Sequence, residues 1–287
     1  MNVSIIIPAY NEEGTIGRCL KNLLDGDNSR NMEIIVVCNG CSDGTAAIAR
    51  TFEPDVTVIE LETGSKILAL NTGDKAAQQY PRFYIDADIV IDQSTIFAVA
   101  EILESGDVLA AAPTMKIDTE HSSPLVKRYY RTWRKIPYST NGMLGSGIYA
   151  ASETGRKRFG EFPDVVGDDA YFRLQFHPEE RQTVPDRFFT ITAPKNLRWL
   201  IGITTRAVIG NIELRKKFPQ LFVREEGGNN SAVFKRVFSG HEKADYLVYA
   251  LIRILIKLNA RRKLFFGTWK SWTHDPTSRS AVDEQER

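Results

Sequence analysis

Two carboxylates, Asp86 and Asp88, flank Ala87 directly after the apolar segment 83–85. Carboxylate oxygens are the hard ligands that Mg²⁺ or Mn²⁺ takes in proteins. Such an ion usually keeps several waters and completes its shell with substrate phosphates. A metal bound here would neutralise the charge that develops on a departing diphosphate. A solvated loop with two acids has the same sequence, so the position of the segment in the fold must decide between these interpretations.

Two more segments place polar and small residues where apolar runs end. Residues 8–12 follow the run 3–7, and residues 39–45 follow the run 33–37. The ring of Tyr10 could stack on a base, and the amide of Asn39 could pair with a base edge. Gly40 would permit close approach of the backbone. Ordinary strand-to-helix turns favour the same residue types, and that alternative stays open.

A third pair of acids, Asp168 and Asp169, begins a helix that we expect to end near Phe176. A carboxylate within hydrogen-bond reach of an acceptor hydroxyl could take its proton. Repulsion from Asp168 would raise the pKa of Asp169, whereas a helix N-terminus would lower it, and the sequence does not give the balance. The alternative is that both acids only cap the helix.

The elements that must position these residues alternate between strand and helix over the first 112 residues. Short apolar strands separated by helices predict an α/β fold with a mostly parallel central sheet and helices on both faces. In such sheets ligands bind outside the carboxyl ends of the strands. We expect strands at 3–7 (ended by Pro8), 33–37, 56–61, 83–85 and 108–112, a helix at 65–79, and helix caps at Asn11, Asp43 and Ser94.

Beyond residue 113 the periodicity weakens, and the predicted elements are a strand at 148–150, the helix that begins at Asp168, and helices at 205–226 and 244–258. We expect a single domain in two halves with a helical extension. The predicted divisions are a nucleotide-sugar-binding half at 1–113, an acceptor-binding half at 114–204, a C-terminal helical extension at 205–274 and a mobile tail at 275–287.

Composition excludes several classes of protein. The 287 residues carry a net charge of +1, which gives no general attraction to nucleic acid. Three cysteines argue against a disulfide framework, and Cys38-x-x-Cys41 lacks a second ligand pair for zinc. No N-terminal secretory pattern and no membrane-spanning run is present, so we expect a cytoplasmic protein.

Taken in order, five segments resemble family 2 glycosyltransferases, which have the GT-A fold. The resemblance implies inverting transfer of a sugar from a nucleotide-diphosphate donor, with a UDP-sugar expected, to an acceptor hydroxyl. Many relatives carry Asp-Asp where this chain has Cys38-Asn39, so the identity of the base is left open. The matching segments are residues 4–13, 36–45, 64–73, 86–88 and 167–171.

The resemblance also implies a role for individual residues. It makes Asp169 the catalytic base, Asp88 the ligand of Mn²⁺ or Mg²⁺, and the segment Gly145-Ser146-Gly147 with Asp168 the border of the acceptor site. The cations Arg198 and Arg206 are candidates for stabilising the leaving group. The donor-binding set is completed by Pro8, Ala9, Tyr10, Glu12, Asn39, Lys66, Asp86 and Ala87.

Two alternatives to a transferase stay open. One is a catalytically inactive module that binds a nucleotide-sugar. The other is a sugar nucleotidyltransferase, although residues 8–13 lack its Gly-rich, Arg-containing phosphate loop. A dehydrogenase is disfavoured because no G-x-G-x-x-G follows the first strand. Residues 203–207 lack the Gln and Trp of processive relatives, so we expect single additions.

The apolar segment 246–258, followed by basic residues to 263, has two interpretations. It could lie in a membrane interface at the inner face of the membrane, which would suit a lipid-linked acceptor. Alternatively, it packs on the domain or on a second subunit in a homodimer, and this packing is the interpretation that we favour.

Overall fold

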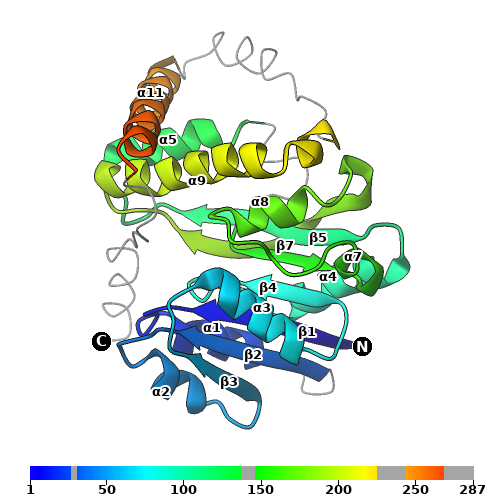
Figure 1. The fold of residues 1–287 in the computed structure, drawn as a ribbon. Helices are drawn as coiled ribbons and strands as arrows, with labels where there is room; N and C mark the ends of the chain where they lie inside the picture. Colours follow the sequence, from blue (N-terminus) through cyan, green and yellow to red (C-terminus); the bar gives the residue numbers. More distant parts are fainter. Residues whose placement is uncertain (27–30, 137–145, 225–242, 268–287) are drawn as a thin grey trace.

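A seven-stranded sheet forms the centre of the protein, with strand order β3-β2-β1-β4-β6-β5-β7 (Figure 1). The computed structural model describes residues 1–26, 31–136, 146–224 and 243–267. All neighbouring strands are parallel except β6, which is antiparallel to β4 and β5. The predicted α/β fold with a mostly parallel sheet is therefore confirmed. The strands are β1 (Asn2–Ala9), β2 (Asn31–Asn39), β3 (Val56–Leu61), β4 (Arg82–Ile85), β5 (Ala110–Asp118), β6 (Ile148–Ala151) and β7 (Arg181–Thr192).

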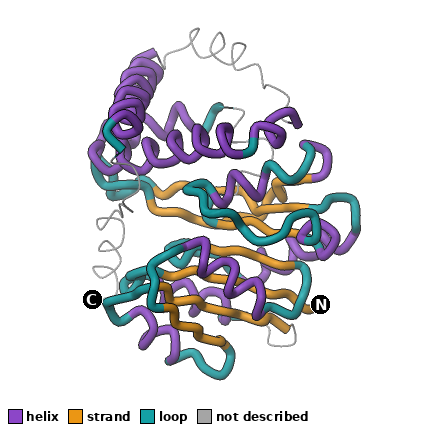
Figure 2. The backbone as a smooth tube through the Cα atoms, in the orientation of Figure 1, coloured by secondary structure: helices purple, strands orange, loops and turns teal. Residues whose placement is uncertain are grey.

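Helices lie on both sides of this strand layer (Figure 2). One apolar core joins the sheet to α1 (Ile16–Leu24), α2 (Thr45–Arg50) and α4 (Gln93–Ser105). A second core, on the other face, joins it to α3 (Lys66–Ala76) and α8 (Asp168–Arg173). The other helices in the described part of the chain are α5 (Pro124–Trp133), α7 (Glu153–Arg156), α9 (Leu197–Lys217), α11 (Lys243–Phe265) and the 3-10 turns η1 (Pro178–Glu180) and η2 (Pro219–Arg224).

Alternation of side chains explains the two cores. Ile5 and Ile7 of β1 point into the first, whereas Ile6 between them points into the second. Successive side chains of a strand face opposite sides of its sheet, so a strand covered on both faces is apolar throughout. The helices α5, α9 and α11 share a third core at one end of the molecule (Figure 1).

Some local predictions were wrong. Pro8 does not end β1, which continues to Ala9. Beyond Ile6 the strand pairs only with β2, so no hydrogen bond to β4 requires an N–H from Pro8. Asn11 is not a helix cap, because it has a left-handed backbone (φ 53°) and α1 begins only at Ile16. Asp92 rather than Ser94 caps α4.

The second half of the chain differed most from prediction. The twelve-residue strand β7 and helix α5 were not predicted, and α9 begins at Leu197, before residue 205. β5 runs across the expected division between the halves at residues 113 and 114. The division at 1–113, 114–204 and 205–274 stays a prediction, and the tail at 275–287 lies outside the described residues.

Candidate active site

The carboxyl ends of β1, β2 and β4 meet at one edge of the sheet, since these strands are parallel. Asp86 follows β4 at this edge, and its backbone N–H donates to the carbonyl of Gly147, 2.8 Å away, just before β6. Gly147 has a φ of +91°, and a Cβ there would lie 3.0 Å from Cγ2 of Ile89. The turn into β6 therefore requires glycine.

Lys66 joins acids that are far apart in the sequence. Its Nζ lies 2.8 Å from Oδ1 of Asp86 and 3.0 Å from Oδ2 of Asp168. Burial opposes its charge, but Asp168 and Asp86 raise the pKa of Lys66 above its ordinary value. Its place at the start of α3, where Ser65 caps the helix, brings the ammonium to the end of β4. Lys66 is therefore held as a cation between two carboxylates.

Tyr149 of β6 also binds Asp168, and sequence analysis gave it no role. Its hydroxyl donates to Oδ2 of Asp168 at 2.9 Å. Burial, followed by the charge of Asp168, raises the pKa of Tyr149 well above its ordinary value, so the phenol keeps its proton. Asp168 is almost fully buried. Its predicted acceptor-binding role stays a prediction, since both interactions here are within the protein.

Asp169, the predicted base, has an unusually basic carboxylate. Burial, followed by repulsion from Asp168, raises its pKa to about 6, although Lys66 and the N–H of Ala170 act in the opposite direction. The N–H of Ala170 lies 2.7 Å from Oδ1. Part of Asp169 stays open to solvent. A partly accessible carboxylate with this pKa could accept a proton near neutral pH.

Asp88 is exposed, beyond the Lys66 contacts. The pKa of the buried Cys19 in α1 is raised to about 12, mainly by burial and next by the negative charge of Asp88. Among the described residues, no three His, Cys, Asp or Glu side chains lie together as metal ligands. One accessible carboxylate nevertheless suits a Mg²⁺ or Mn²⁺ ion whose remaining ligands are waters and donor phosphates.

The predicted nucleoside side of the site is built on close backbone contacts. Gly40 has a φ of +62°, and a Cβ there would lie 2.5 Å from the backbone N of Gly64. A Cβ at Gly64 would lie 3.1 Å from Cε2 of Tyr10. The Tyr10 ring therefore lies against the backbone that follows β3. Pro8, Ala9 and Ala87 are buried at the same strand ends.

Asn39 and Glu12 mainly hold this edge together. The amide of Asn39 is buried and donates to the carbonyl of Ala9 at 2.8 Å, which joins the ends of β1 and β2. The carboxylate of Glu12, also buried, accepts from the Thr15 hydroxyl at 2.8 Å. The backbone N–H of Glu12 donates to Thr45 at 2.7 Å. Their predicted contacts with a nucleoside stay predictions.

The two candidate arginines lie on α9. A Cβ at Gly210 would lie 3.3 Å from the N of Gly167, so α9 passes directly beside the start of α8. Arg206 lies one turn before Gly210, on the same side of the helix. Arg198 is exposed more than two turns from Gly210. In the predicted acceptor segment, Ser146 and Gly147 precede β6, whereas Gly145 lies outside the described residues.

This sheet carries acids at its carboxyl edge, one directly after β4 and two at the start of α8. The arrangement is that of the GT-A class of glycosyltransferases. The chain belongs to glycosyl transferase family 2, whose family model matches residues 4–175. Among curated proteins it is similar to the poly-β-1,6-N-acetyl-D-glucosamine synthase of Staphylococcus epidermidis, with 33% identity over 112 residues. That match covers 38% of this chain and 27% of the synthase. This chain therefore spans only about a quarter of that relative.

Solved structures support the fold. The mannosyltransferase PcManGT of Pyrobaculum calidifontis, in complex with GDP-Man and Mn²⁺, has a TM-score of 0.59 and 19% identity, covering 99% of this chain and 84% of that one. TarS of S. aureus in complex with UDP-GlcNAc has a TM-score of 0.51 and 20% identity, covering 67% of this chain and 58% of that one. At such identities the likeness shows the fold alone.

Proposed function

We propose that this glycosyltransferase moves a sugar, with inversion, from a nucleoside-diphosphate donor to an acceptor hydroxyl. The main support is the pair of contacts from Lys66 to Asp86 and Asp168, because they bring the end of β4 beside the start of α8. Asp169 would accept the proton of the hydroxyl while the new carbon–oxygen bond forms and the bond to the diphosphate oxygen breaks. Lys66 would hold the carboxylates in place during this step.

Asp88 is the expected ligand of a divalent ion that arrives with the donor. Such an ion would neutralise charge on the departing diphosphate. PcManGT was solved with GDP-Man and Mn²⁺, and TarS with UDP-GlcNAc, which supports a nucleotide-sugar donor and a divalent metal. Of the two nucleotides in these complexes, GDP and UDP, we expect UDP in the donor of this enzyme. The acceptor that we expect is a polysaccharide, glycolipid or other glycoconjugate, which a lipid carrier could present.

The test is a thermal-shift screen of UDP- and GDP-sugars with and without Mn²⁺. A ligand that binds the folded state raises the melting temperature, and the rise grows with the logarithm of its concentration. We expect a metal-dependent rise for wild type and its loss in Asp88→Ala. Asp55→Ala, which removes an exposed acid in the turn before β3, is the matched control.

Other outcomes would replace the proposal. Stabilisation that is the same without metal, or unchanged in Asp88→Ala, would contradict the metal site. Release of inorganic pyrophosphate would indicate a nucleotidyltransferase. Donor binding with neither hydrolysis nor transfer for any acceptor pool would indicate an inactive binding module.

A further inference from the structure

Helix α11 has apolar side chains on two opposite faces. Its inner face packs into the third core, against α5 and α9, through Tyr249, Ile252 and Ile256, and Ala260 on the same face is also buried. Asn259 adds a hydrogen bond of 3.1 Å to the hydroxyl of Thr205. This face accounts for the helix being attached to the protein, and confirms that segment 246–258 packs on the domain.

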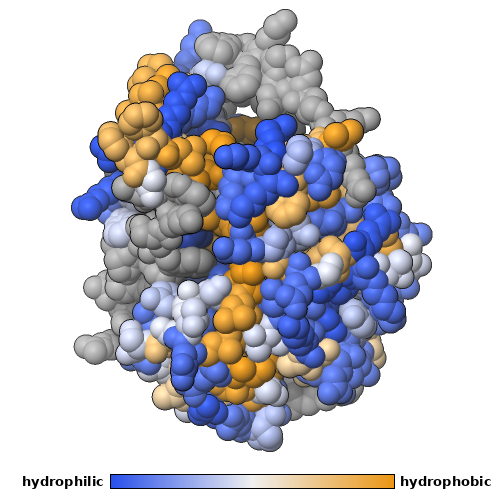
Figure 3. Space-filling model, in the orientation of Figure 1, coloured by the Kyte–Doolittle hydropathy of each residue, from blue (hydrophilic) through white to orange (hydrophobic). Residues whose placement is uncertain are grey.

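The outer face is exposed. Five Leu and Ile side chains on it are 47% to 60% exposed, at spacings that place them on one side of the helix, opposite the buried residues. On an ordinary surface helix this side is polar. Contiguous apolar surface of this kind marks a site of interaction. Figure 3 shows hydrophobic residues gathered along α11. The five are Leu247, Leu251, Ile254, Leu255 and Leu258.

Cations border this apolar face. Lys257, Arg261 and Arg262 are exposed on α11. The only acid of the helix is Asp245, which lies 2.8 Å from Arg131 of α5 and so is already paired. The whole chain has a net charge of only +1, so positive charge is concentrated here. The outer face of α11 therefore combines apolar side chains with cations that no acid of this helix neutralises.

A groove between α9 and α11 extends the cationic surface. It has a volume of about 520 Å³ and is lined by Arg215, Lys216 and Arg253 together with Asn211 and two apolar side chains, Val208 and Ile212. None of the described residues that line it is a carboxylate. On α11, Arg253 precedes Lys257 by one turn, so the groove and the cations of the outer face are continuous. Such a groove suits a phosphate group attached to an apolar chain.

We propose that the outer face of α11 docks on a membrane surface that contains anionic phospholipids. Its Leu and Ile side chains would enter the headgroup region, and the cations of α11 and of the groove would contact lipid phosphates. None of the described helices is long and apolar enough to cross a membrane. A symmetric dimer through this face would put Lys257, Arg261 and Arg262 of both copies into one interface, where the one acid of α11 is already paired, and like charges disfavour it.

The experiment is flotation of the full chain with vesicles of phosphatidylcholine alone or with about one third phosphatidylglycerol. Near an anionic surface each Lys or Arg contributes about a fivefold factor in partitioning. We expect at least about tenfold stronger binding to the anionic vesicles, weakened by salt. Leu251→Ser with Leu258→Ser, and separately Lys257→Glu with Arg261→Glu, should each reduce this binding by about tenfold or more.

Matched controls are Leu68→Ser and Lys75→Glu, which alter an exposed leucine and an exposed cation of α3. Both should bind vesicles as wild type does. The proposal is overturned if wild type does not bind anionic vesicles, or if both double variants bind them normally. It is also overturned if sedimentation shows a dimer that Leu251→Ser dissociates. Docking does not depend on the donor chemistry, so donor-induced thermal shifts should persist in all these variants.

Discussion

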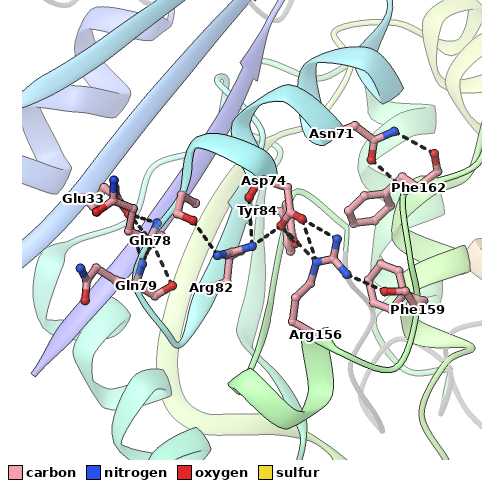
Figure 4. A network of polar contacts seen from close by, with 12 residues as sticks. Glu33, Asn71, Asp74, Gln78, Gln79, Arg82, Tyr84, Arg156, Phe159 and Phe162 are labelled. Carbon is pink, nitrogen blue, oxygen red and sulfur yellow. Dashed lines mark hydrogen bonds and ion pairs between the residues drawn. The ribbon is translucent and has the colours of Figure 1, made fainter.

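Two ionic clusters lie along the same helix, α3, and have opposite charge balance. Near its end, Asp74 is a single carboxylate with several donors: Oδ1 accepts from Arg82 at 2.9 Å and from Tyr84 at 2.5 Å, and Arg156 binds both oxygens (Figure 4). At its start, Lys66 is a single cation between Asp86 and Asp168, with Asp169 beside them.

The pKa values show what this difference means. Burial alone would raise the pKa of Asp74, but hydrogen bonds from Arg156 and Tyr84 hold it below its ordinary value of 3.8. The pKa of Asp169 is instead raised to about 6. The Asp74 carboxylate is paired on both oxygens by donors within the protein, as in a structural network. The Lys66 cluster keeps surplus negative charge, which is typical of a site that handles protons or cations.

Two stacked tyrosines connect the clusters. Tyr84 of β4 and Tyr149 of β6 are directly paired in the sheet, with ring centroids 5.1 Å apart. The hydroxyl of Tyr84 donates to Asp74, whereas that of Tyr149 donates to Asp168. The same kind of side chain can therefore be compared in two settings, with Tyr84 in the structural cluster and Tyr149 in the candidate catalytic cluster.

The largest effect is expected for Asp169→Asn, which removes the proposed base. General base catalysis contributes roughly 10²- to 10⁴-fold, so transfer should fall by that factor while the donor still binds. Rates of transfer and donor-induced thermal shifts measure the two effects. Asp164→Asn, which alters an exposed acid nearby, should be close to wild type. Near-normal transfer by Asp169→Asn would remove the distinction between the clusters.

Asp74→Asn should act on stability. Breaking a buried ion pair costs about 3–5 kcal/mol, which urea unfolding would measure. Because the pKa of Asp74 is lowered in the folded state, its stabilisation is present above pH 3.8 and is lost as the pH falls through the lower folded value. The deficit of the variant should therefore be full at neutral pH and shrink in acid. A deficit that does not depend on pH would contradict this account of Asp74.

The smallest and most discriminating effect compares Tyr149→Phe with Tyr84→Phe. Each loses a hydrogen bond to a charged group, worth about 1.5–3 kcal/mol, so both should be less stable. Only Tyr149→Phe should also lower the turnover number, because Asp168 borders the proposed base. A loss of about 1.4 kcal/mol in the transition state corresponds to a rate about tenfold lower. Equal turnover in the two variants would show that the Tyr149 contact is structural.

Much of the sheet could be predicted because its strands are short apolar runs. Residues 56–61 were predicted as a strand with the bounds of β3, and a strand was predicted at 83–85, within β4. A strand was also predicted at 148–150, within β6, but its antiparallel pairing with β4 could not be predicted, because four apolar residues carry no sign of direction. The same ambiguity hid Tyr149, whose role depends on β6 pairing with β4.

The site was predicted as a set of residues but not as a network. The parallel arrangement predicted that the carboxyl ends of β1, β2 and β4, which carry Tyr10, Asn39 and Asp86, meet at one edge, and the strand pairing confirms this. The sequence could not show that Lys66 lies between Asp86 and Asp168, since that contact depends on how α3 and α8 pack side by side on the same face of the sheet. Nor could it give the sign of the pKa change at Asp169, which burial decides.

The most direct test of this account is the dependence of transfer on pH at saturating donor and acceptor. Since the pKa of Asp169 is about 6, its proton-accepting form predominates above this pH and is lost below it. We predict a rate that falls through a midpoint near pH 6 as the solution is acidified, with the same midpoint in Tyr84→Phe. A rate that stays constant down to about pH 4, where an ordinary aspartate titrates, would contradict Asp169 as the base.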